Sequence, residues 1–224
     1  FRVLLVLFLL ALLYFIYRYR IRQQHKLFNL ENKAQRLEKE KVMVMYENLK
    51  QHLNPHFLFN SLTSLSSLIR INQLQAGDFL DKMSKVYRYI LKNRDNETVP
   101  LQEELRFVKL YIELQQTRFE EGLQVNLQVE EDALSSKIAP VTLQNLVENA
   151  IKHNTADPQS PLVIDLYTKD GFLVVQNNLQ KKKFVETSNR QGLKNMESLY
   201  RYLSERPMQV VETADHFIVK IPLL

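Results

Sequence analysis

Hydrophobic side chains recur at helical spacing in two neighbouring segments near the middle of the chain. The first stripe predicts an amphipathic helix whose apolar face is formed by Leu58, Leu62, Leu65 and Ile69. The opposite face of that helix carries His56, Asn60, Thr63 and Ser67. The second stripe follows a polar turn predicted at 73–78 and is formed by Phe79, Met83, Val86 and Ile90. Two antiparallel helices make a poor core alone, so we expect two copies to form a four-helix bundle as a homodimer.

After a link at 92–100, the pattern alternates between helical and strand periods. Helices are predicted over 101–119, 141–153 and 192–203. Strands are predicted over 123–129, 162–167, 172–175, 208–211 and 217–221. This alternation indicates an α/β two-layer sandwich. With the preceding helical hairpin, the fold class is predicted to be α+β.

The sequence starts with an almost wholly apolar run that basic residues follow directly. Positions 3–17 are apolar or tyrosine, and Arg18, Arg20 and Arg22 come next. This order predicts the end of a transmembrane helix at 1–17, with the segment after it in the cytoplasm. Because the sequence begins with Phe1 and not methionine, we expect its start to be cut. A signal peptide would carry its basic residues before the apolar run, which disfavours that alternative.

The segment 18–53 contains neither glycine nor proline and is predicted to be a juxtamembrane coiled-coil signalling helix. Its seam is formed by Leu27, Leu30, Ala34 and Leu37. The phase then slips to a new stripe formed by Val42, Met45, Leu49 and Leu53. The slip is either packing noise or a place where helix rotation is relayed from the membrane towards His56.

Composition excludes several classes of function. Hydrophobic residues make up 45% of the 224 positions, enough for one catalytic-size core with a helical extension. The chain has no cysteine, which rules out a disulfide scaffold and a thiolate metal site. The net charge of +5 is modest, and no basic stripe interleaved with aromatic residues indicates direct contact with nucleic acid.

His56 follows an Asn54-Pro55 pair that resembles an N-cap and the first position of a helix. In that geometry a phosphate on the imidazole would lie near the positive end of the helix dipole. Alternatively, Pro55 kinks a longer helix. Both geometries leave His56 facing outward, where an imidazole with a pKa near 6.5 is a nucleophile at neutral pH. A lone surface histidine is more often just a solvated side chain.

A second motif, Pro140 to Asn154, predicts a helix with a buried face of Leu143, Leu146, Val147 and Ile151. Its remaining surface carries Glu148, Asn149, Lys152 and His153. Oxygen ligands suit Mg²⁺ and cations suit phosphates, so this surface suits a metal-bound polyphosphate. The plainer alternative is a solvated polar face on which Glu148 and Lys152 pair at i, i+4.

The two motifs together resemble the LytS/YpdA-type family of bacterial sensor histidine kinases. The resemblance covers approximately 40–224 and rests on Asn54-Pro-His-Phe-Leu-Phe-Asn60 followed by Val147-Glu-Asn-Ala-Ile-Lys-His153. It implies a dimerisation and phosphotransfer hairpin at 54–95 and a Bergerat-type ATP-binding catalytic domain at 96–224. It further implies that His56 receives the γ-phosphoryl group of ATP, that Asn149 coordinates Mg²⁺ and that Glu148 supports the metal.

The rest of the expected nucleotide site departs from the usual histidine kinase pattern. Asn177 stands where an aspartate normally reads the adenine amino group, and Leu179 stands at a glycine position. Asparagine can still accept a hydrogen bond from that amino group. The glycine-rich segment beside the phosphates is reduced to Gly192 before Leu193, where Gly192 is otherwise an ordinary loop glycine. Lys152 and His153 are expected to approach the phosphates.

The resemblance implies a kinase in the bacterial inner (cytoplasmic) membrane, with its catalytic part in the cytoplasm. It would pass phosphate to an aspartate of a separate response regulator, for which the family expectation is a LytTR-type DNA-binding protein. Phe57 stands where many histidine kinases carry an acidic base, and His52 is a weak substitute. Asn60 either orients a water for dephosphorylation of the regulator or stabilises its helix.

Two other functions stay open. A degenerate kinase would act mainly as a regulator phosphatase or as an ATP-binding dimeric scaffold, and the altered nucleotide boxes motivate this alternative. A Bergerat-fold ATPase would use hydrolysis for conformational work. His56 argues against the ATPase, because a hydrolase needs no phosphoacceptor on a helical bundle.

Overall fold

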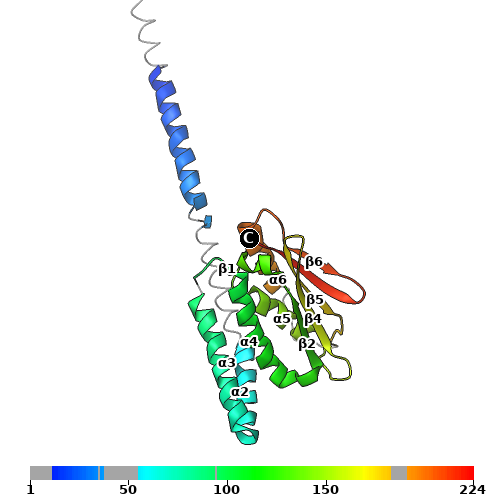
Figure 1. Cartoon of the computed structure of the whole chain (residues 1–224). Helices are drawn as coiled ribbons and strands as arrows, with labels where there is room; N and C mark the ends of the chain where they lie inside the picture. The colour runs from blue at the N-terminus through cyan, green and yellow to red at the C-terminus, as the bar shows by residue number, and fades with distance from the viewer. Residues whose placement is uncertain (1–11, 35, 38–54, 94, 183–190) are drawn as a thin grey trace, which may run out of the picture. The chain divides into compact units, whose positions relative to one another are not determined.

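The computed structural model describes residues 12–34, 36–37, 55–93, 95–182 and 191–224 (Figure 1). The side chains of Pro55, His56 and Gln191 are outside this description. Contacts divide the chain into two compact units, Phe1–Lys50 and Gln51–Leu224.

In the first unit, residues 12–34 are helical. The predicted transmembrane helix lies mostly outside the described residues, and the predicted coiled coil is described only over 18–34 and 36–37. Within the described ranges, no helix combines the length and the apolar character needed to cross a membrane.

The second unit begins with a helical hairpin of α2 (Pro55–Ile71) and α3 (Gln73–Lys92). Asn72 is extended, with φ −153° and ψ 100°, and its side chain accepts a hydrogen bond from the backbone N–H of Gln75 at 3.2 Å. This cap starts α3 at once, so the turn predicted at 73–78 is wrong. The predicted stripe of α3 is buried, and Ala76 extends it.

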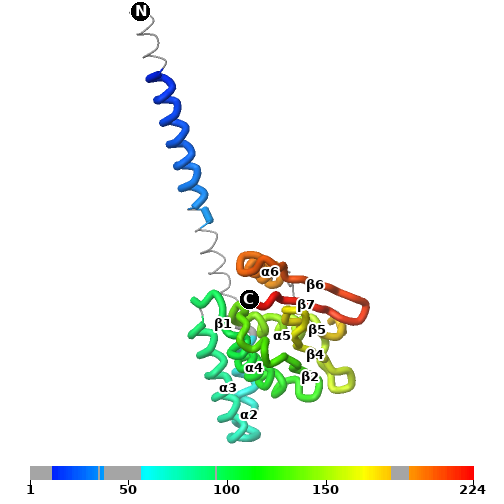
Figure 2. Tube along the Cα trace, turned by 45° about the horizontal axis from the view of Figure 1, so that its top comes forward, coloured from blue at the N-terminus to red at the C-terminus, as the bar shows by residue number. Residues whose placement is uncertain are grey.

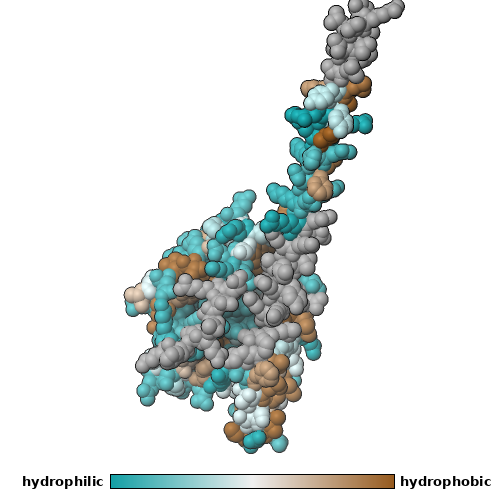
Figure 3. Space-filling view, turned by 180° about the vertical axis from the view of Figure 1, so that it is seen from behind, coloured by the Kyte–Doolittle hydropathy of each residue, from teal (hydrophilic) through white to brown (hydrophobic). Residues whose placement is uncertain are grey.

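The buried face of α2 differs from the predicted stripe. Phe57 and Ser61 are buried, whereas Leu58, Leu62 and Ile69 are 36%, 47% and 54% exposed. Within its own chain, α2 turns the Phe57 side towards α4 (Leu101–Phe119). There the centroid of the Phe57 ring lies 5.0 Å from that of Tyr111. Figure 3 shows hydrophobic surface at the lower end of the view, over the hairpin. The predicted stripe is therefore still available to a second helical pair.

Phe57→Ala is expected to lower the free energy of unfolding by about 3 kcal/mol, because it opens a cavity beside the buried Tyr111 and the half-buried Tyr87. Phe57 is 6% exposed, and the centroid of its ring also lies 6.2 Å from that of Tyr87. Urea denaturation of the purified chain measures the loss. Tyr202→Ala is the matched control, because Tyr202 is 70% exposed and should lose less than about 0.5 kcal/mol. Equal losses in the two variants would contradict the packing described for α2.

The rest of the second unit is a mixed sheet covered by helices (Figure 1). Its helices after α4 are α5 (Thr142–His153) and α6 (Gln191–Leu203), with 3₁₀ turns η1 (Glu120–Gly122) and η2 (Glu131–Ser135). The sheet is formed by β2 (Leu123–Gln128), β4 (Leu162–Lys169), β5 (Phe172–Asn178), β6 (Gln209–Glu212) and β7 (His216–Pro222). A separate pair, β1 (Val99–Pro100) with β3 (Lys137–Ile138), was not predicted.

The five strands lie in the order β2-β4-β5-β7-β6, which can be followed along the trace in Figure 2. β2 and β4 are parallel, and the remaining neighbours are antiparallel. Asp170 and Gly171, with φ 53° and 73°, form the two-residue turn between β4 and β5, a conformation that Asp-Gly pairs favour. Every predicted helix and strand of this part is present, so the predicted α+β class is confirmed.

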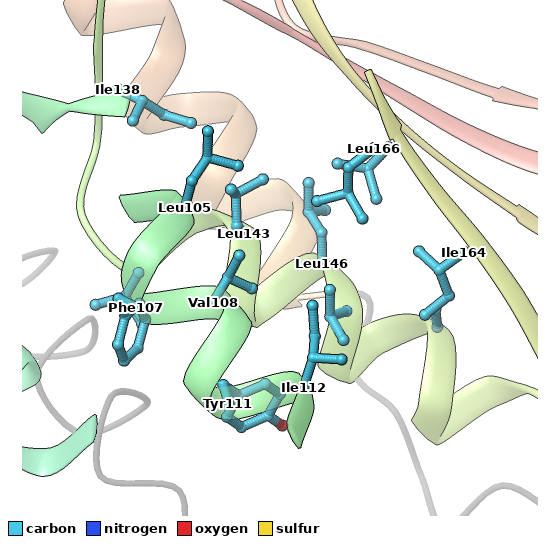
Figure 4. Close-up of a cluster of buried hydrophobic side chains, with 14 of the residues drawn as sticks. Leu105, Phe107, Val108, Tyr111, Ile112, Ile138, Leu143, Leu146, Ile164 and Leu166 are labelled. Carbon is cyan, nitrogen blue, oxygen red and sulfur yellow. The ribbon is translucent and has the colours of Figure 1, made fainter. Parts of the chain in front are cut away.

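The core lies between the helices and the sheet. Figure 4 shows Leu105, Val108 and Ile112 of α4 facing Leu143 and Leu146 of α5, with β4 side chains beyond them. Because α4 packs against α5 on one side and against the hairpin on the other, it connects the two predicted parts of the site.

Candidate active site

His56 lies in the first turn of α2, where only its backbone is described. Asn54 and residues 38–53 lie outside the described residues, so the N-cap and kink alternatives both stay open. One turn later, Asn60 is half-buried and lines a crevice shared with α3 and α4. The crevice has a volume of about 10 Å³, room for one water molecule and not for a nucleotide.

α5 carries the second motif, and its predicted buried face is confirmed, since Leu143, Leu146, Val147 and Ile151 are all buried. Asn149 is half-buried on the other side of the helix. Among the described residues no hydrogen bond holds its amide, which leaves the amide oxygen open to a ligand. No cluster of three or more metal-binding carboxylate or imidazole groups occurs within the described ranges.

The sequence predicted Glu148 on the polar surface of its helix, but its carboxylate is largely buried. Gln144 donates to its carboxylate at 3.4 Å, and the buried hydroxyl of Tyr111 hydrogen-bonds with it. Burial raises the pKa of Glu148, although these hydrogen bonds and the charge of Lys152 act in the opposite direction. The carboxylate is thus oriented by two neighbours from α4 and α5.

Basic groups gather at the C-terminal end of α5. Lys182 donates from Nζ to the carbonyls of Ile151 at 2.9 Å and Lys152 at 3.3 Å. Burial lowers the pKa of His153, and the charges of Lys152 and Lys182 lower it further. Burial and the nearby Arg118 lower the pKa of Lys182 as well. The sequence predicted Lys152 and His153 here but missed Lys182, whose only signal was a lysine run after a strand.

The remaining predicted residues lie on β5 and α6. β5 extends three residues beyond its prediction, so Asn177 is inside the strand, 4% exposed, and donates to the carbonyl of Asn178 at 2.6 Å. Gly192 is exposed within the first turn of α6, where a side chain would meet nothing within 4 Å, and Leu193 packs against the core. Packing therefore does not require a glycine at 192 within the part of the chain described.

Glu104, for which the sequence predicted no role, is the most deeply buried charged side chain near the site. It is 0% exposed and accepts three hydrogen bonds, from the hydroxyl of Tyr89 and the backbone N–H groups of Val141 and Leu143. Burial outweighs these bonds and raises the pKa of Glu104 to about 7.

The pH dependence of stability follows from that shift. In the unfolded chain Glu104 ionises at its usual pKa of 4.5, but in the fold it keeps its proton until about pH 7. Its stabilising contribution is complete below pH 4.5 and is lost as pH rises through about 7, by roughly 3 kcal/mol at most.

Urea denaturation at pH 5.5, 6.5 and 7.5 measures this loss. Glu148 acts with the same sign and His153 with the opposite one, so the informative quantity is the difference between the wild type and Glu104→Gln. We expect the variant to show the flatter pH dependence. Parallel curves for the two proteins would refute the assignment to Glu104.

The histidine kinase family matches residues 44–123 of the chain, which include His56. Sensor protein LytS of Oceanobacillus iheyensis is 32% identical over 189 residues, 80% of this chain and 30% of LytS. Sensor histidine kinase BtsS of Escherichia coli is 36% identical over 126 residues, 55% of this chain and 22% of BtsS. Sensor histidine kinase/phosphatase LytS of Staphylococcus aureus is 31% identical over 147 residues, 66% of this chain and 24% of that protein.

The chain spans less than a third of the length of these relatives. The family match, which includes the α2 helix, and the similarity to these relatives place it among the histidine kinases. Within that class, it belongs to the LytS-type family.

Proposed function

We propose that the chain is the kinase part of a membrane-bound two-component sensor. It phosphorylates itself on His56 from Mg-ATP and passes the phosphoryl group to an aspartate of a separate response regulator, for which a LytTR-type protein is the family expectation. The observation that carries the proposal is that one compact unit, Gln51–Leu224, contains both the helix that bears His56 and the open polar side of α5.

The residues of α5 suit a nucleotide bound with magnesium. Asn149 offers an uncommitted amide oxygen of the type that Mg²⁺ accepts, and the metal, when bound, neutralises phosphate charge. Glu148, oriented by Gln144 and Tyr111, would support the metal beside Asn149. Lys152 and His153, at the basic end of the helix, face the phosphates.

Residues from two later elements complete the nucleotide site. Asn177 reads the adenine amino group from the end of β5 with its side-chain oxygen, while its side-chain nitrogen donates to the Asn178 carbonyl. Gly192 and Leu193 lie at the start of α6, where backbone N–H groups can meet phosphate.

The transfer itself is an in-line displacement. The imidazole of His56 attacks the γ-phosphorus, the bond to the β–γ bridging oxygen breaks, and ADP leaves. Positioning and charge neutralisation supply most of the rate, because the transition state is loose. The phosphohistidine then donates its phosphoryl group to the regulator's aspartate.

The exposed stripe of the hairpin supports a homodimer. Leu58, Leu62 and Ile69 of α2 and Leu80 of α3 are each at least 36% exposed in the single chain. Pairing with a second hairpin would bury them in a four-helix bundle. The apolar run at 1–17 would anchor this dimer in the cytoplasmic membrane of a bacterium, with the catalytic part in the cytoplasm.

Phosphatase activity towards the regulator is the second candidate. It is favoured by Asn60, one turn from His56, whose crevice has room for one water molecule. The printed name of the S. aureus relative includes phosphatase activity for that protein.

The deciding experiment incubates the chain with γ-labelled Mg-ATP and tests the stability of the bound label. Acid-labile, base-stable label is expected, because phosphohistidine has that chemistry. Nucleotide binding without any label would overturn the kinase proposal and favour the phosphatase or scaffold.

A further inference from the structure

α5 begins without a cap of its own. Val141, just before the helix, adopts left-handed backbone angles, with φ 65° and ψ 7°, and makes no side-chain capping bond. A β-branched residue is strained in this region, so the surrounding structure must hold it there. The groups that hold it come from another helix.

Glu104 of α4 supplies the missing cap. Its Oε2 accepts the Val141 N–H at 3.0 Å, and its Oε1 accepts the Leu143 N–H at 3.0 Å. A carboxylate satisfies the unpaired N–H groups at the start of a helix and faces the positive end of its dipole. The position of α5 is thereby fixed relative to α4.

The same carboxylate also joins the hairpin. The hydroxyl of Tyr89, on α3, donates to Oε2 of Glu104 at 2.7 Å. The ring of Tyr89 is stacked on Phe107 of α4, with centroids 4.2 Å apart and an interplanar angle of 15°. Packing therefore holds the ring in place, and the hydroxyl has a defined direction.

One buried side chain thus connects three helices. α3 is the partner of the helix that carries His56, and α5 carries Asn149 on its second turn. Neither Glu104 nor Tyr89 belongs to the polar side of α5 that faces the nucleotide.

We propose that Glu104 and Tyr89 are positioning residues that set the ATP-binding helix α5 against the phosphoacceptor hairpin, so that phosphoryl transfer depends on the bond between them. This inference rests on the proposed kinase function. Glu104 acts on the nucleotide site through α5, whereas Tyr89 acts on the register between α5 and the hairpin.

Tyr87 provides a matched control on the same helix. Its hydroxyl is buried and has no hydrogen-bond partner within the described structure, while its ring contacts Phe57. Tyr87→Phe and Tyr89→Phe each remove one hydroxyl from α3, but only the second removes a bond to Glu104.

The test measures Mg-ATP affinity and the rate of label incorporation at saturating ATP for Tyr89→Phe, Tyr87→Phe and Glu104→Gln. For Tyr89→Phe, the Kd for Mg-ATP should stay within about twofold of the wild type and the rate should fall about tenfold, as expected for the loss of one hydrogen bond. Glu104→Gln should weaken ATP binding at least about tenfold, because an amide cannot accept both N–H bonds. Tyr87→Phe should change neither quantity by more than about twofold.

Equal rates for Tyr89→Phe and Tyr87→Phe would overturn the role of Tyr89, and an unchanged Kd for Glu104→Gln would overturn that of Glu104. Failure of the proposed function has a separate signature, which is the absence of label in the wild type. In that case the dependence on Tyr89 falls with the kinase proposal, and the Kd of Glu104→Gln alone decides the role of Glu104.

Discussion

His56→Ala is expected to lower the incorporation of phosphoryl label from γ-labelled ATP by at least about a thousandfold, because it removes the proposed attacking nucleophile. The affinity for Mg-ATP should stay within about twofold of the wild type, since the proposed nucleotide-binding face lies on α5 and His56 lies on α2. The measurement combines acid-labile label at a fixed time with nucleotide affinity from the same preparation.

His25→Ala is the matched control for this experiment. His25 lies exposed in the helix at 12–34, so its loss should leave the label unchanged. Acid-labile label that survives His56→Ala would place the phosphoacceptor elsewhere, with His52 the nearest alternative along the chain.

Asn149→Ala is expected to weaken magnesium-dependent ATP binding by about a hundredfold and to abolish labelling of His56. The amide oxygen of Asn149 is the metal ligand in our proposal, and alanine has no replacement for it. Alanine also favours the helix, so the melting temperature should not fall. Titration with ATP, with and without Mg²⁺, measures the effect.

Asn126→Ala serves as the control, because Asn126 is an exposed amide on β2 whose side chain bonds only to Asp165 among the described residues. It should bind ATP as the wild type does. If Asn149→Ala retains full magnesium-dependent affinity, the metal ligand assigned here is wrong.

The fold of the catalytic part could be predicted closely from the sequence. α4 matches its prediction at both ends, because Pro100 precedes it and Gly122 follows its last turn closely. Strands with one buried face, such as β4, can be predicted because buried and less buried side chains alternate along them. These signals are local, and local signals are what a sequence pattern records.

The hairpin was predicted less well for two physical reasons. The polar residues at 73–78 looked like a turn, yet Asn72 alone caps α3 and the helix continues through Gly77. The predicted stripe of α2 is apolar but exposed within one chain, and Phe57 is buried in its place. The spacing of apolar residues alone does not distinguish a stripe that is exposed in the single chain from one that is buried in its core.

The site residues of α5 were found because they form one motif, and their roles in binding stay predictions. Glu104 was missed because an acidic pair in a helix is commonplace, and its partners Val141 and Leu143 lie 37 and 39 positions away. Only the packing of α4 on α5 brings the carboxylate to those N–H groups. The same packing brings Tyr111 of α4 to Glu148 of α5, a contact that the sequence did not predict.

The Asp170–Gly171 turn has a consequence for how the sheet assembles. It pairs Lys169 with Phe172 across a two-residue connection, whereas the parallel partners Leu123 and Leu162 are separated by the whole of α5. Closing a long loop costs more entropy than closing a short one, so local pairings form faster. The β4–β5 hairpin should therefore nucleate the sheet during folding. β2 and β7 should join later, because 39 positions separate the paired residues of β2 and β4, and 38 to 50 positions separate those of β5 and β7.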